Sequence, residues 1–131
     1  MPQASDLMGF GLPPFLAEQL GNTVQSVTGA GTTLATAAKI YSEGHLVLVT
    51  GASSQTGAVL PAAAKIGTPY YICSVGGTAA KIWPNSASGT INGGSAGAGV
   101  TFSAAVASGI FIKTAQTSAG VDTWYTIPLT P

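Results

Sequence analysis

Short runs of alternating apolar and polar residues, separated by turn residues, fill the chain from Asn22 onward. Residues 45–50 (HLVLVT) predict a buried strand, and residues 122–127 (DTWYTI) predict the last strand. Weaker patterns of the same kind cover residues 22–28, 32–41, 58–60, 100–106 and 110–113, and turns are expected at 29–31, 52–57, 93–99, 108–109 and 115–120. Pro61 places the strand at 58–60 at an edge or an end. Turn signals about 8–12 residues apart are typical of a sandwich or barrel. We therefore expect an all-β domain, an antiparallel β-sandwich of jelly-roll type, over residues 22–131.

The stretch Gly67–Gly93 has the most specific pattern in the chain. Its sequence, GTPYYICSVGGTAAKIWPNSASGTING, predicts two strands joined by a two-residue turn at Gly76-Gly77, with Pro84 ending the second strand. In that register one face of the hairpin points inward and carries Tyr71, Cys73, Val75, Ala80 and Ile82. The other face carries Tyr70, Ile72 and Trp83, and we expect a Tyr70–Trp83 pair to serve as an outward contact with another subunit. We read Cys73 as a small buried apolar residue rather than a nucleophile.

Residues 1–21 differ from the rest and are expected to form an N-terminal arm. Apolar side chains crowd this segment, and Pro13 and Pro14 precede a brief helix predicted for Phe15–Leu20 that ends at Gly21. So short a helix needs a surface to dock on. Residues expected to contact a neighbouring subunit or a larger shell are Phe10, Leu12, Pro13, Phe15 and Leu16.

The composition favours a protein that associates with other chains. Only 6% of the 131 residues are charged, the net charge is zero, and there is no arginine. Soluble domains normally carry about 25% charged residues, and an uncharged surface promotes association. Phosphate binding needs clustered basic residues, and the four lysines are scattered, so a nucleic-acid partner is not expected. Neither a membrane-spanning run nor a signal peptide is expected.

Catalytic motifs are weak, and we expect no enzyme activity, cofactor, metal or small-molecule substrate. Residues 47–57 (VLVTGASSQTG) resemble a dinucleotide-binding turn, but Gln55 replaces the glycine that lets the backbone approach the phosphates, and Pro61 interrupts the helix that should follow. The only histidine, His45, has no nucleophile in register. Glu43 and Asp122 are too separated to indicate a glycosidase pair.

A family resemblance rests on the segments Gly67-Thr-Pro-Tyr-Tyr71, Ile82-Trp-Pro84, Thr90-Ile-Asn-Gly93 and Thr123-Trp-Tyr125. Together they resemble a pattern of small virion proteins of tailed bacteriophages. The resemblance covers most of residues 12–127 and is carried mainly by turn glycines and core aromatics. The Gly-rich loop at 93–99 is longer than the corresponding connection in that pattern.

The resemblance implies a capsid decoration (cement) protein, a homotrimer that binds the major capsid protein at the virion surface after synthesis in the host cytoplasm. The alternative that it leaves open is a tail-fibre, spike or adhesion module that binds a host glycan through exposed aromatics such as Tyr70 and Trp83. The exact oligomeric state and the choice between capsid and tail stay open at this point.

Overall fold

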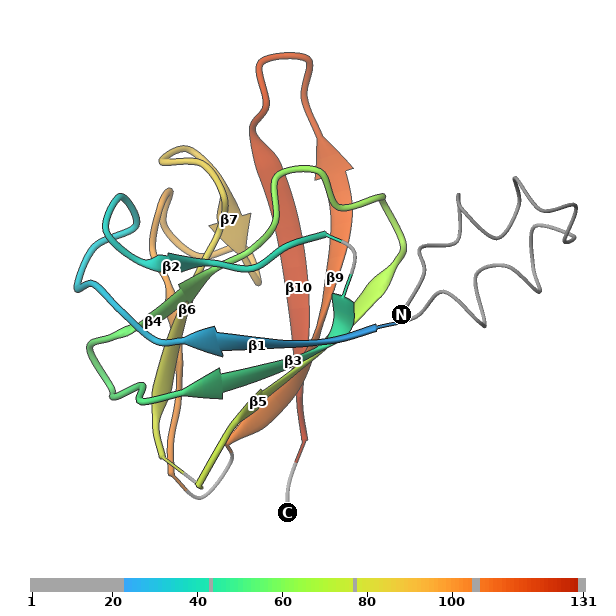
Figure 1. The fold of residues 1–131 in the computed structure, drawn as a ribbon. Coiled ribbons are helices and arrows are strands. Elements are labelled where there is room, and N and C mark those ends of the chain that lie inside the picture. Colours follow the sequence, from blue (N-terminus) through green and yellow to red (C-terminus); the bar gives the residue numbers. More distant parts are fainter. Residues whose placement is uncertain (1–22, 43, 77, 105–106, 130–131) are drawn as a thin grey trace, which may run out of the picture.

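The chain passes back and forth between two β-sheets. The computed structural model describes residues 23–42, 44–76, 78–104 and 107–129, and in this part every regular element is a strand. One sheet has six strands, in the spatial order β1 (Thr23–Thr28), β3 (Gly44–Thr50), β5 (Pro69–Ser74), β9 (Ser108–Gln116), β10 (Asp122–Leu129) and β7 (Thr90–Ile91). The other has four, in the order β2 (Ala38–Lys39), β4 (Gly57–Val59), β6 (Ala80–Trp83) and β8 (Val100–Phe102) (Figure 1).

This alternation explains why most neighbouring strands are parallel. From β1 to β8, each strand is followed in sequence by a strand of the opposite sheet. Parallel neighbours need a crossover connection, which in most proteins is a helix. Here the crossover from β1 to β3 is β2, and the crossover from β3 to β5 is β4. Five of the eight strand pairs in the described chain are parallel as a result.

The expected all-β class is confirmed, and the expected antiparallel order is not. Both sheets are mixed, and the antiparallel pairs are β5–β9, β9–β10 and β6–β8. Alternation of polar and apolar residues identifies strands but does not say in which direction neighbours run. The N-terminal arm, its Phe15–Leu20 helix and the boundary between 1–21 and 22–131 lie outside the described residues and stay predictions.

The hairpin predicted at Gly76-Gly77 does not form. β5 lies in the six-stranded sheet between β3 and β9, whereas β6 lies in the four-stranded sheet between β4 and β8. The short connection therefore carries the chain from one sheet to the other. A hairpin with that turn would pair Cys73 with Ala80, whereas Cys73 is paired with Leu48 and Ser108.

The faces predicted for β5 are also inverted. Tyr70 and Ile72 point into the core and are each 1% exposed, whereas Tyr71 and Val75 are 44% and 46% exposed. Both parities of this strand are apolar, so the sequence alone could not decide which one faces the core. The predicted burial of Ala80 and Ile82 on β6 is confirmed, as is the end of that strand before Pro84.

Elsewhere most of the predicted strands are present: the segments 22–28, 58–60, 100–106 and 110–113 overlap β1, β4, β8 and β9, whereas 32–41 is a strand only at β2. β3 and β10 contain the predicted segments 45–50 and 122–127. Most of 32–41 is a turn in which the carbonyl of Thr33 accepts hydrogen bonds from the amides of Thr36 and Ala37. The turn predicted at Ser108-Gly109 is instead the start of β9. Pro61 lies just beyond the end of β4, as predicted, although β4 is an interior strand.

The two sheets share one hydrophobic core. The rings of Tyr70 and Trp124 meet edge to face with centroids 6.1 Å apart, and those of Phe102 and Phe111 lie 5.6 Å apart. The core side chains, from both sheets and the connections between their strands, are Val27, Ile40, Val47, Val49, Ala52, Ala58, Leu60, Ala64, Tyr70, Ile72, Ala80, Ile82, Ile91, Phe102, Phe111 and Trp124. A second, smaller cluster on the other face of the four-stranded sheet consists of Trp83, Val59, Ala37 and Leu34.

Candidate functional site

The outer face of the six-stranded sheet carries an unbroken row of apolar residues across five strands. Val24 of β1 is paired with Leu46 of β3, and Leu46 with Tyr71 of β5. Tyr71 is paired in turn with Ile110 of β9, and Ile110 with Ile127 of β10. Because residues paired across a sheet share a face, these five side chains form one continuous band. We call this surface the apolar face.

The apolar face is open in the described chain. Val24 is 61% exposed, Leu46 40%, Tyr71 44% and Ile127 56%. Single exposed apolar residues are ordinary on a protein surface, whereas a contiguous patch rarely stays open in a soluble monomer. Residues of the same parity that extend the apolar face are Leu48, Cys73, Ile112 and Tyr125.

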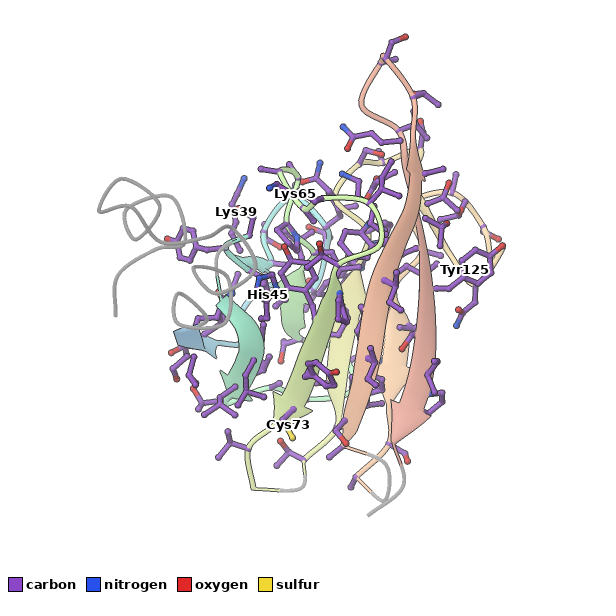
Figure 2. The ribbon with its side chains drawn as sticks, turned by 90° about the vertical axis from the view of Figure 1, so that its right-hand side faces the viewer. Lys39, His45, Lys65, Cys73 and Tyr125 are labelled. Atoms are coloured by element: carbon purple, nitrogen blue, oxygen red, sulfur yellow. The ribbon has the colours of Figure 1, made fainter. Side chains whose placement is uncertain are left out.

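No charge interrupts this surface. Among the described residues of the six strands, the only Asp, Glu, Lys or Arg side chains are Lys113 and Asp122, and both point inward, with exposures of 1% and 2%. Figure 2 shows Lys39 and Lys65 toward the end of the molecule opposite Cys73. A strand that presents charges on its outer side resists unwanted association, and the six-stranded sheet lacks this protection.

A depression of about 200 Å³ lies within the apolar face. Its lining residues are Leu46, Tyr71, Ile72, Cys73, Ser108 and Gly109. The small side chains of Cys73 and Ser108 are paired across β5 and β9, next to the larger pair of Tyr71 and Ile110. A side chain that protrudes from a partner could fill this depression, which is how anchors at protein interfaces are usually seated.

A second concavity, of about 360 Å³, lies where β8 meets the free edge of β10, and its lining residues are Asn92, Val100, Thr101, Phe102, Ser103, Thr126 and Pro128. β7 pairs with β10 only at Thr123 and Trp124, so within the described part of the chain the rest of that edge has no neighbouring strand. The amide of Thr126 donates to Asn92 Oδ1 at 2.8 Å. The next residue of the same parity, Pro128, has no amide hydrogen. This edge therefore offers few donors to an added strand.

Asp122 is a buried carboxylate whose hydrogen bonds are well satisfied. Its oxygens accept from the amides of Asn85 (2.7 Å) and Ser86 (3.1 Å), the Ser86 hydroxyl (2.8 Å) and Trp124 Nε1 (2.5 Å). Burial acts to raise the pKa of Asp122, but these hydrogen bonds outweigh it and hold the pKa below its ordinary value. Asp122 thus fixes the loop after β6 to the start of β10, which is a structural role.

Lys113 is the matching buried cation on β9. Its Nζ donates to the carbonyls of Ala62 (3.0 Å) and Ala64 (3.3 Å) and to Gln116 Oε1. Burial lowers the pKa of Lys113, and the negative charge of Asp122 partly offsets this effect. The ammonium therefore holds the 61–66 loop against the sheet. A charged residue in an apolar strand normally indicates a surface position, and for this reason sequence reasoning missed both Lys113 and Asp122.

His45 contributes to the packing at the start of β3. Its ring lies 5.1 Å from the ring of Tyr70, and its Nδ1 is buried without a hydrogen-bond partner. The Tyr70 hydroxyl donates to the carbonyl of Ser42 at 2.7 Å, and burial raises the pKa of Tyr70 to about 12. Within the described ranges, no group of three or more His, Cys, Asp and Glu side chains could hold a metal ion.

The residues predicted to make contacts fall into two groups. Phe10, Leu12, Pro13, Phe15 and Leu16 lie outside the described residues. Tyr70 and Trp83 are 1% and 4% exposed, so the prediction that they form an outward contact is wrong. Tyr70 belongs to the inward parity of β5, and Trp83 is covered by Ala37, Val59 and Leu34. Strands that are apolar at both parities, as in Tyr70–Cys73 and Ile110–Ile112, were the available signal for the apolar face.

Comparison with known proteins gives no relative: no family model, curated protein or solved structure matches this chain. In the described residues there is no helix long and apolar enough to cross a membrane.

Proposed function

We propose that this chain is a decoration protein of a tailed-phage capsid, which binds the assembled head as an oligomer and stabilises it. The observation that carries the proposal is the apolar face, an open sheet surface with no charged side chain among its described residues. Such a surface is typical of a protein that works in contact with other chains. The expected homotrimer and the major capsid protein as its partner belong to this proposal.

The mechanism is stabilisation by mass action. A protein that binds only the assembled shell favours the assembled state by an amount that grows with its concentration relative to its dissociation constant. Burial of the apolar face, between copies or against the shell, would supply about 25 cal/mol for each square ångström of apolar surface removed from water. This binding needs no catalytic group, cofactor or substrate, and it takes place at the outer surface of the virion.

The alternative role, a fibre or spike module that binds a glycan, loses the residues on which it was based. Tyr70 and Trp83 were to form an exposed aromatic platform, and both are buried. Of the exposed tyrosines, Tyr71 and Tyr125 share the apolar face but are separated by β9, and Tyr41 lies outside the strands, so the three do not form one aromatic platform. We therefore keep the decoration role as the single proposal.

A binding experiment on phage heads tests the proposed function. The full-length protein would be added to heads purified from a phage whose gene for this protein has been deleted, and bound copies would be counted by quantitative mass spectrometry. We expect saturation at on the order of hundreds of copies per head, as repeated symmetric positions on a shell require. Saturation on tails, or no binding to heads, would reject the role.

Two variants show whether the apolar face makes the contact. Leu46→Lys and Tyr71→Lys place a charge in the middle of the face, and we expect each to weaken head binding by about tenfold or more, or about 1.4 kcal/mol. Ser118→Lys adds the same charge in the exposed turn between β9 and β10 and is the matched control. Equal binding by all three variants would show that another surface makes the contact.

A further inference from the structure

The apolar face needs a partner, and the chain itself contains a segment suited to it. We propose that residues 7–17 of one copy pack on the apolar face of the next copy and so link the subunits into a closed ring. This inference rests on the proposed function, because that role calls for an oligomer. It goes further by naming the two surfaces that meet.

Residues 7–17 and the apolar face match in their chemistry. Residues 7–17, LMGFGLPPFLA, contain no charged residue and include six large apolar side chains, Leu7, Met8, Phe10, Leu12, Phe15 and Leu16. The apolar face is equally free of charge. Burying a charge against an apolar surface is costly, so an uncharged, apolar segment is the appropriate occupant.

The prolines in residues 7–17 limit how this segment can pack on a neighbouring copy. Pro13 and Pro14 have no amide hydrogens, so this segment is poorly suited to pair as an additional strand at a sheet edge. The free edge of β10 is itself blocked by Asn92 and Pro128. Packing by side chains on the face of a sheet remains, and the depression beside Tyr71 and Cys73 provides a seat for an aromatic ring of the segment.

The position and the length of residues 7–17 allow them to reach the apolar face of a neighbouring copy. Five residues, 18–22, separate the segment from Thr23, the start of β1, which is an edge strand of the six-stranded sheet. From an edge, the chain can extend outward to a neighbour without crossing its own sheet. The row from Val24 to Ile127 spans four strand spacings, or about 19 Å. The eight residues 7–14, which precede the predicted helix, reach about 26 Å when extended, which is enough to cover it.

Symmetry favours exchange between copies in a ring. Contact between two identical faces would be isologous and give a dimer, whereas contact between a segment and a different surface is heterologous and gives a ring when the rotation between copies closes. The expected trimer requires the second kind. A stacked pair of apolar faces and the folding of the segment over its own sheet are the competing arrangements.

The single native cysteine makes a direct test possible, because Cys73 lies on the apolar face at the depression. In the full-length chain, Gly11→Cys or Ala17→Cys would add one second thiol within the segment. After mild oxidation, non-reducing gels and intact mass would show which thiols join, since a disulfide forms only where Cα atoms come within about 7 Å.

We expect disulfides between chains that give covalent dimers and trimers, with the trimer as the largest species. Ser118→Cys, in the exposed turn between β9 and β10, measures disulfides formed by random collision, and removing Cys73 from the Ala17→Cys chain should abolish the ladder. A disulfide within a single chain would overturn the inference in favour of the segment's own sheet. Cross-linking no greater than in the Ser118→Cys control would overturn it as well.

The result is separable from the head-binding experiment. A covalent trimer that does not bind heads would preserve the contact and reject the decoration role. Head binding by an Ala17→Cys chain that forms no cross-link between positions 17 and 73 would preserve the role and reject the contact.

Discussion

A Cβ atom added to Gly89 would lie 2.2 Å from Oδ1 of Asp122. The loop after β6 can therefore approach the carboxylate only because residue 89 has no side chain. This close approach places the amides of Asn85 and Ser86 within hydrogen-bond distance of Asp122, at 2.7 and 3.1 Å. Gly89 and Asp122 thus form one structural unit that joins the loop to β10.

We predict that Gly89→Ala destabilises the fold by about 2–4 kcal/mol, because the new methyl group must displace a buried, hydrogen-bonded carboxylate. Thermal or urea unfolding would measure the change. Ser88→Ala, at an exposed position of the same loop, is the control and should stay within about 0.5 kcal/mol of the wild type. Equal stability of the two variants would show that the loop moves aside at little cost.

The lowered pKa of Asp122 predicts a loss of stability in acid. The folded-state pKa lies below the unfolded value of about 3.9, so the stabilisation is fully present above that pH and declines as the pH falls toward the folded-state pKa. Asp122→Asn should unfold more easily at pH 7, by about 2–4 kcal/mol, because an amide places a donor opposite donors. Its stability should also fall less steeply below pH 4. Urea midpoints between pH 2 and 7 test both effects, and parallel curves for the two proteins would contradict the assignment.

The raised pKa of Tyr70 predicts a loss of stability at high pH. Its folded-state pKa of about 12 lies above the ordinary value of 10.0, so the stabilisation is fully present below pH 10 and is lost between pH 10 and 12. Tyr70→Phe also removes the hydrogen bond to the Ser42 carbonyl, at a cost of about 1 kcal/mol at pH 7. The gap between wild type and variant should narrow as the pH rises above 10. Tyr125→Phe, at a 51% exposed position, is the control.

The places of the two strongest strands were predictable from the sequence. The first six residues of β10, DTWYTI, and the run HLVLVT of β3 were found at their observed places because they are short runs rich in β-branched, aromatic and leucine side chains. The pairing of strands was not predictable in the same way. Gly76-Gly77 has the sequence of a tight hairpin turn, yet the strands on its two sides enter different sheets, and only long-range packing makes that choice.

The apolar face could not be predicted from the sequence, because the strand at its centre is apolar on both sides. On β5, Tyr70 and Ile72 form one apolar parity, and Tyr71 and Cys73 form the other, so the pattern gave no reason to prefer either as the core face. The core takes Tyr70, whose ring contacts Trp124 and whose hydroxyl reaches the Ser42 carbonyl. The apolar face is the parity left outside. Lys113 and Asp122 were missed for the converse reason, because burial of a charge depends on partners that are distant in sequence.

The free edge of β10 gives the last prediction. Asn92 has a φ of 56°, in the left-handed region, and its side chain accepts the amide of Thr126 at 2.8 Å. Asn92→Gly preserves that backbone conformation and removes the acceptor, so the Thr126 amide becomes available to another chain. We expect concentration-dependent self-association beyond the wild-type state, measured by sedimentation velocity.

Asn92→Asp is the matched control, because its carboxylate still accepts from the Thr126 amide while the backbone preference stays similar. It should sediment like the wild type. Leu46→Lys combined with Asn92→Gly separates the two surfaces, since a charge on the apolar face should leave association through the β10 edge unchanged. If the double variant sedimented like Leu46→Lys alone, the extra association of Asn92→Gly would belong to the apolar face, and the protective role of Asn92 at the edge would be wrong.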